Sequence, residues 1–110
     1  MKFKRIQAII RISKFDEVRN ALDEIGVEFF IYSDVKGVAF HSNNKISYRG
    51  ASINEINAVP WRCIEIVIPE IDVEDIVDCI KRNAQTGSIG DGRIYVSSVD
   101  ESIRISLDQL

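Results

Sequence analysis

The sequence is poor in the residues that would point to several classes of protein. It holds two cysteines and one histidine among 110 residues, too few to suggest a disulfide framework or a metal site. We expect Cys63 and Cys79 to be reduced, buried and inert. No apolar run is long enough to cross a bilayer, and Arg11 and Lys14 interrupt the apolar core that a signal peptide would need. A cytoplasmic protein that does not insert into membranes is therefore the expectation.

The sequence also lacks an excess of positive charge and the side-chain patterns of common catalytic sites. Its formal net charge of -3 argues against binding to duplex nucleic acid, and the aromatic signature of RNA-binding sandwiches is absent from it. Paired carboxylates and Ser-His-Asp or Cys-His spacings are absent too. Asp91 is the only candidate base for an ATP-hydrolysing enzyme. We therefore expect a binding protein without catalytic residues and without a nucleic-acid partner.

What is present is the composition of one soluble globular domain spanning residues 1–110, with 45% hydrophobic and 28% charged residues. Apolar residues alternate along 4–11 and 29–36, as in strands, and between them a capping box at Ser13 begins a helical pattern that ends at Gly26. The same order returns later in the chain, with expected strands at 63–68, 93–99 and 102–107 and a helix between Asp72 and Thr86. This repeat predicts an α+β fold, a ferredoxin-like β-α-β-β-α-β sandwich.

Apolar residues occupy both faces of the expected strands, although two helices can cover only one face of a four-stranded sheet. Ile9 lies on the opposite face from Ile6 and Ile10, and Val67 likewise alternates with Ile66. Self-association is the simplest way to bury the second face. The alternative is that Ile9 and Val67 are scattered exposed apolar residues, which soluble proteins commonly carry.

Two segments do not fit a minimal sandwich of this kind. Residues 38–60 form a long, polar connection between two strands that a short turn could join, and connections of that length are usually functional or mobile. Residues 86–93 place three glycines within six positions and end in Arg93. Glycines let successive backbone N–H groups converge on an anion, and a guanidinium can clamp phosphate oxygens. The alternative for this segment is a tight turn built from glycines.

The glycine-rich segment closely resembles the signature of the PII nitrogen-regulatory proteins, which reads T-G-x-I-G-D-G-K-I-F-V. The corresponding stretch here is Thr86-Gly87-Ser88-Ile89-Gly90-Asp91-Gly92-Arg93-Ile94-Tyr95-Val96, with Arg93 in place of the lysine and Tyr95 in place of the phenylalanine. Further blocks resemble the same family in the same order and together cover nearly the whole chain: residues 6–11, 15–18 with 21–22, 35–37, 48–51 and 64–67.

The resemblance implies a homotrimer of ferredoxin-like subunits that holds ATP or ADP in clefts between neighbours and is not an enzyme. Carried over by position, the implied nucleotide-binding residues are Ile9, Gly37 and Val38 in the cleft wall, Glu65 and Val67 near the ribose and adenine, Ile89, Gly90, Asp91, Gly92 and Arg93 at the phosphates, and Arg104 from the adjacent subunit. For Glu65 and Arg104, which are charges set within apolar strands, the alternative is a structural ion pair or a solvated edge position.

Residues 38–60 correspond in this resemblance to the T-loop, the segment through which PII proteins dock on an ammonium transporter, a metabolic enzyme or another regulator. The implied partner-binding residues are His41, Lys45, Tyr48, Arg49, Ser52 and Glu55.

Several positions depart from the family in ways that affect its second ligand, 2-oxoglutarate. His41 replaces a glutamine that helps to hold a magnesium ion between ATP and the keto acid, and Trp61 replaces a lysine that pairs with the keto-acid carboxylate. Arg62 is adjacent, but strand alternation directs it to the opposite face. Ser106 replaces a second phosphate-binding arginine. Each lost charge-assisted contact costs on the order of 1.5–3 kcal/mol, so we expect nucleotide binding to survive and the magnesium-dependent 2-oxoglutarate response to be weakened or lost.

Two interpretations remain open beside this one. Trp61 could be a stacking platform for a base or, more simply, an anchor at the foot of the long loop. The chain could also be a ferredoxin-like trimer with a different small-molecule effector, or a metal-tolerance trimer of the CutA type, although the Gly90-Asp91-Gly92 block argues against the latter.

Overall fold

The computed structural model describes residues 1–38 and 58–106 of the chain, and the predicted partner-binding residues between 41 and 55 lie outside that range. Four strands and two helices follow the predicted order, with two short 3-10 turns ahead of the helices. The elements are β1 (Phe3–Arg11), η1 (Ile12–Lys14), α1 (Phe15–Glu24), β2 (Ile31–Val38), β3 (Ala58–Pro69), η3 (Glu70–Asp72), α3 (Val73–Ala84) and β4 (Gly92–Val99).

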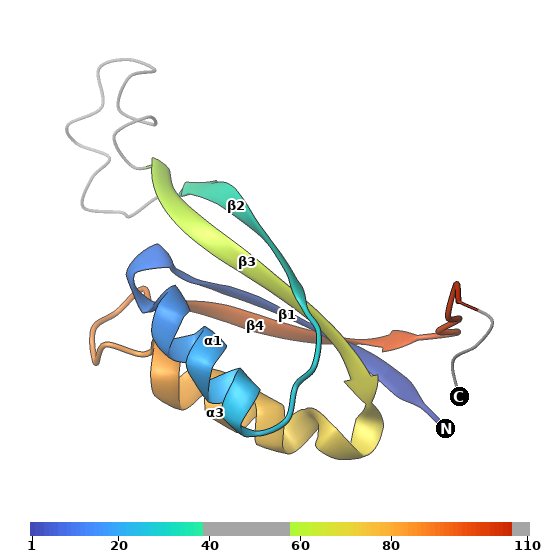
Figure 1. Cartoon of the computed structure of the whole chain (residues 1–110). Coiled ribbons are helices and arrows are strands. Elements are labelled where there is room, and N and C mark those ends of the chain that lie inside the picture. The colour runs from blue at the N-terminus through green and yellow to red at the C-terminus, as the bar shows by residue number, and fades with distance from the viewer. Residues whose placement is uncertain (39–57, 107–110) are drawn as a thin grey trace.

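The strands form one antiparallel sheet in the order β2-β3-β1-β4, and both helices lie against the same face of it (Figure 1). The β1–α1–β2 unit has β3 between its two strands, and the β3–α3–β4 unit has β1 between its two strands. This arrangement confirms the predicted ferredoxin-like sandwich.

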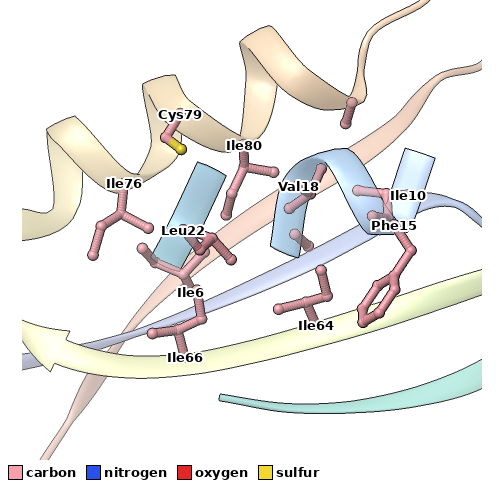
Figure 2. Packing of buried hydrophobic residues seen from close by; sticks show 12 residues of the cluster. Ile6, Ile10, Phe15, Val18, Leu22, Ile64, Ile66, Ile76, Cys79 and Ile80 are labelled. Atoms are coloured by element: carbon pink, nitrogen blue, oxygen red, sulfur yellow. The ribbon is translucent and has the colours of Figure 1, made fainter. Parts of the chain in front are cut away.

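The core lies between the two helices and the face of the sheet that they cover. Ile6, Ala8 and Ile10 on β1 alternate toward the helices, and the register places Ile66 opposite Ile6 and Ile64 opposite Ala8. Figure 2 shows the labelled isoleucines of β1 and β3 facing Leu22 and Val18 of α1 and Ile76, Cys79 and Ile80 of α3. The period of two in the strands and of 3.6 in the helices thus converge on one apolar layer.

Both helices begin through a 3-10 turn, which differs from the predicted capping box. Lys14 is the N-cap of α1 and makes no side-chain capping hydrogen bond; instead the Phe15 N–H donates to the Ile12 carbonyl. A backbone hydrogen bond therefore satisfies one of the N–H donors that the start of a helix otherwise leaves unpaired. At the other end Gly26, with φ of 94°, ends the helix as predicted, since this left-handed conformation favours glycine.

The predicted extra strand at 102–107 is wrong for the residues that the structure describes. Residues 102–106 form no strand, and Ile103 and Ile105 are exposed. Alternating apolar residues form a strand only where the edge of another strand is available for pairing. Residues 102–106 follow β4, and within the described residues they add no strand to the sheet. The ladder between β2 and β3 is longer than expected, because it runs out to the Val38–Ala58 pair.

The face of the sheet away from the helices, here called the open face, carries the other half of each strand's side chains. Several large apolar residues on it are between 37% and 53% exposed: Ile31, Val35, Val59, Val67 and Tyr95. Apolar residues therefore do occupy both faces, as the strand pattern predicted. Cys63 lies on this face and Cys79 in the core; both are buried and unpaired, and burial raises the pKa of each thiol.

Candidate functional site

The segment between α3 and β4, residues 85–91, is here called the glycine loop, and its path depends on glycine backbone conformations. Gly87, Gly90 and the first residue of β4, Gly92, all have positive φ. At Gly92 the requirement is doubled, because a Cβ there would lie 1.9 Å from the carbonyl oxygen of Ile9. Only glycine combines that close approach to β1 with that backbone conformation.

Asp91 fixes the shape of the glycine loop through three hydrogen bonds. Its carboxylate accepts from the Thr86 N–H at 2.7 Å, from the Thr86 hydroxyl at 2.7 Å and from Arg11 Nε at 3.0 Å. These donors, Thr86 first and Arg11 after it, lower the pKa of Asp91 to about 2. A carboxylate that binds protons so weakly is a poor general base, which argues against the ATP-hydrolysing role considered for Asp91.

Arg11 connects the glycine loop to the end of the β2–β3 ladder. Its guanidinium carbon lies 5.8 Å from the centroid of the Trp61 ring while its Nε binds Asp91. The Trp61 ring in turn covers Gly37, since a Cβ at that position would lie 2.8 Å from the indole nitrogen. Trp61 therefore packs on the backbone at the foot of the connection between β2 and β3, as expected of an anchor.

Arg62 occupies the opposite face from Trp61, as strand alternation predicted. Its guanidinium donates to both Asp34 oxygens, at 2.6 Å and 3.1 Å, and lies over the rings of Phe15 and Tyr32 at 4.5 Å and 4.8 Å. The hydrogen bonds lower the pKa of Asp34 and raise that of Arg62. This guanidinium is committed to the helix-covered side of the sheet, so it cannot replace a cation at position 61.

The structure brings one group of the predicted nucleotide-binding residues together around the end of β1. Ile9 pairs with Arg93 across the β1–β4 ladder, and both line a cavity of about 480 Å³ together with Asp91 and Gly92. Ile89 and Gly90 lie in the adjoining glycine loop, where the Ile89 side chain is almost fully exposed. Gly37 and Val38 end β2, on the far side of Trp61 from Arg11.

A second group lies elsewhere on the same chain. Glu65, Val67 and Arg104 line a separate cavity of about 970 Å³, which also includes Phe29 and Ile31. Glu65 makes a long ion pair with Arg5, at 3.9 Å. Gly92 pairs with Ile10 and Val67 with Arg5, and the strand rise makes these positions roughly 17 Å apart along β1. Figure 1 likewise places the glycine loop and residues 101–106 at opposite ends of the sheet.

Three contributors to this arrangement do not stand out from the sequence. Arg11 and Thr86 bind Asp91, and Phe29 lines the larger cavity. Thr86 and Asp91 are five residues apart within a glycine-rich turn, and this spacing could have identified the hydrogen bonds between them. The part played by Arg11 depends on the pairing of β1 with β4, which single-strand patterns do not specify.

Across residues 1–38 and 58–106, no group of three or more His, Cys, Asp or Glu side chains could hold a metal ion. Within the same residues, none of the helices has the length and apolar character needed to cross a membrane.

Comparison with known proteins gives one consistent result. A family model described as nitrogen regulatory protein P-II matches residues 3–109. Nitrogen regulatory protein P-II of Bradyrhizobium diazoefficiens is 44% identical over 93% of this chain and 90% of its own length, and P-II 2 of Methanothermobacter thermautotrophicus is 43% identical over 93% and 88%. The crystal structure of Arabidopsis thaliana PII bound to citrate matches with a TM-score of 0.77 and 33% identity, over 94% of this chain and 83% of that one.

Proposed function

Because the chain belongs to the P-II family of nitrogen regulatory proteins, which are regulators and not enzymes, we propose that it is a cytoplasmic signalling protein that binds ATP and ADP between identical subunits. The observation that carries the proposal is the glycine loop, a turn held by the hydrogen bonds of Asp91, with the exposed Arg93 two residues beyond its end. Family members bind effectors and regulate partner proteins; the identity of the effector is the part proposed here.

The glycine loop has the physical properties of a phosphate site. Its positive-φ glycines turn successive backbone N–H groups, which can converge on an anion. Arg93, the second residue of β4, is exposed, so its guanidinium can reach phosphate oxygens. The Asp91 carboxylate already accepts three hydrogen bonds within the chain. We therefore assign the backbone of Asp91, and not its negative side chain, to the phosphate.

The separation of the two residue groups supports a site shared between copies. Glu65 and Val67 line a different cavity from Gly92 and Arg93, so a nucleotide that touches both groups is most simply held between two chains. The exposed apolar residues of the open face supply a surface for that association, because a sheet covered on one face only can bury the other against its copies. A trimer of the kind that the family resemblance implies would bring the two cavities of neighbouring chains together and would cover the open face.

The response to 2-oxoglutarate is proposed to be weakened or lost. At position 61 an indole stands where a cation would be needed, and Arg62 is held by Asp34 on the other face. Arg11, whose guanidinium lies 5.8 Å from the Trp61 ring, is bound to Asp91. The carboxylate of 2-oxoglutarate would have to displace the Asp91 carboxylate from Arg11 to gain a charge-assisted hydrogen bond near Trp61.

The regulatory output is proposed to pass through the connection between β2 and β3, which Trp61 and Gly37 support at its foot. Nucleotide occupancy would change the relative energies of conformers of this connection, and the favoured conformer would bind a partner such as an ammonium transporter or a metabolic enzyme.

Calorimetry with ATP tests the phosphate assignment. Arg93→Gln removes a charge-assisted contact, so we expect affinity to fall about ten- to a hundredfold. Arg19→Gln is the matched control, because Arg19 lies on α1, pairs with Asp16 at 3.8 Å and lines neither large cavity. Equal ATP affinity in the two variants would contradict the assignment. In the same instrument, tight magnesium-dependent binding of 2-oxoglutarate to the ATP-loaded protein would contradict the proposed loss.

A further inference from the structure

Phe29 is a large aromatic residue that the fold leaves uncovered. It lies in the extended connection between α1 and β2, where Val27 and Phe30 pack against the core while Phe29 remains 76% exposed. Its neighbour Phe30 is only 6.4 Å from Phe15, ring centroid to centroid. Phe29 therefore contributes little to the core, and its ring is available to another molecule.

The register of the sheet places Phe29 beside the residues assigned to the nucleoside end of the ligand. Ile31 pairs with Glu65 at the end of the β2–β3 ladder, and Phe29 precedes this paired position by two residues. The larger cavity agrees with that placement, because Phe29, Ile31, Glu65 and Val67 all line it. Ile31 and Val67 are each about half exposed, so with Phe29 they supply the exposed apolar part of the cavity lining, here called the apolar wall.

The remaining lining of this cavity favours a small polar ligand over a second copy of the chain as the occupant. The lining carries the carboxylates of Glu28, Glu65, Asp72, Asp75 and Asp78 and the guanidiniums of Arg82 and Arg104, whereas the centres of protein–protein interfaces are depleted of charged residues. The volume of about 970 Å³ lies within the usual range of ligand pockets.

We propose that the ring of Phe29 is the stacking surface for the purine base of the bound nucleotide, with Val67 completing the apolar wall and Glu65 accepting hydrogen bonds from the nucleoside. The inference rests on the proposed function and names a specificity-determining residue for it. An aromatic ring attracts the π-face of a base, and an ionised carboxylate accepts hydrogen bonds only, so it selects ligands that carry hydroxyl or amino donors. The phosphates of the same ligand would lie on the glycine loop of a neighbouring copy.

The test compares ATP with inorganic triphosphate, which carries the same phosphates without a nucleoside, by calorimetry on full-length variants. Phe29→Ala is expected to weaken ATP binding about tenfold or more and to leave triphosphate binding unchanged. Phe29→Tyr is expected to keep ATP affinity within about twofold of the wild type, since it preserves the ring. Ile71→Ala is the matched control, because Ile71 is also a largely exposed apolar residue, at 86%, and lines neither cavity.

Three outcomes overturn the inference, and they differ from one another. Unchanged ATP affinity in Phe29→Ala, in a protein that binds ATP, rejects the stacking role alone. Loss of the oligomer in Phe29→Ala, measured by sedimentation velocity without ligand, assigns the ring to the contact between chains. Absence of any ATP binding by the wild type rejects the stacking role together with the proposed function.

Discussion

The two faces of the sheet are built from the same strands and are completed in different ways. On one face α1 and α3 close the core within the chain, and Ile6, Ile64 and Ile66 are at most 1% exposed. On the open face, apolar side chains such as Val67 and Tyr95 stay about half exposed and share the surface with Glu65 and Arg93. The comparison indicates that the chain specifies its fold with one face and presents its proposed ligand contacts with the other.

The largest expected effect contrasts one residue from each face. Ile64→Ala should lower the free energy of unfolding by about 3–4 kcal/mol, because it leaves a cavity in the closed core. Val67→Ala should cost about 1 kcal/mol or less, and that cost should shrink as the protein is diluted, since its covering contacts would come from other copies. Urea denaturation at several protein concentrations measures both. If the two variants lose the same free energy of unfolding at every protein concentration, the open face is packed as completely as the core face.

The next effect sharpens the comparison at the glycine loop, where two glycines with positive φ differ in their surroundings. Gly92→Ala should destabilise the protein by about 3 kcal/mol, because strain in φ is combined with a clash against the Ile9 carbonyl. Gly87→Ala should cost only about 1 kcal/mol, since no atom lies within 4 Å of the added Cβ. Thermal denaturation of the two variants gives the difference. A larger cost at Gly87 would contradict the described approach of β4 to β1.

The smallest effect concerns the pH dependence of the glycine loop. The pKa of Asp91 is lowered to about 2, so its ionised form stabilises the folded state above the pKa of about 3.9 that it has in the unfolded chain. That stabilisation is lost as pH falls from about 4 toward 2. Asp91→Asn should therefore have a lower denaturation midpoint than the wild type at pH 7, and the two should converge on acidification. Asp100→Asn changes an exposed carboxylate outside the loop and should leave the denaturation midpoint near that of the wild type at both pH values. If the midpoints of Asp91→Asn and the wild type still differ at pH 2, ionisation of Asp91 is not the cause of the difference.

Local patterns were sufficient for most of the fold and for the presence of a glycine turn between α3 and β4. Alternation at Ile6, Ala8 and Ile10 and the terminator at Gly26 depend on neighbours in sequence, so the strands and helices could be predicted. The glycine loop could be predicted for the same reason. The failed strand at 102–107 shows the limit, because a strand requires a partner edge that its own sequence does not contain.

What could not be predicted depends on register between distant segments. Arg11 meets Asp91 only because β1 pairs with β4, and Phe29 lines the same cavity as Val67 because β2 pairs with β3. A prediction made one strand at a time contains neither pairing. The preference for a 3-10 entry over a capping box is similarly a competition between a backbone and a side-chain hydrogen bond, and the two differ by too little energy for sequence to decide.

The place of Trp61 has a practical consequence. It is the single tryptophan of the chain, and it lies between the guanidinium that binds Asp91 and the backbone of Gly37. Indole emission responds to nearby charge and packing, so the native fluorescence of the unlabelled protein reports from one known location. That location is the junction between the glycine loop and the end of the β2–β3 ladder.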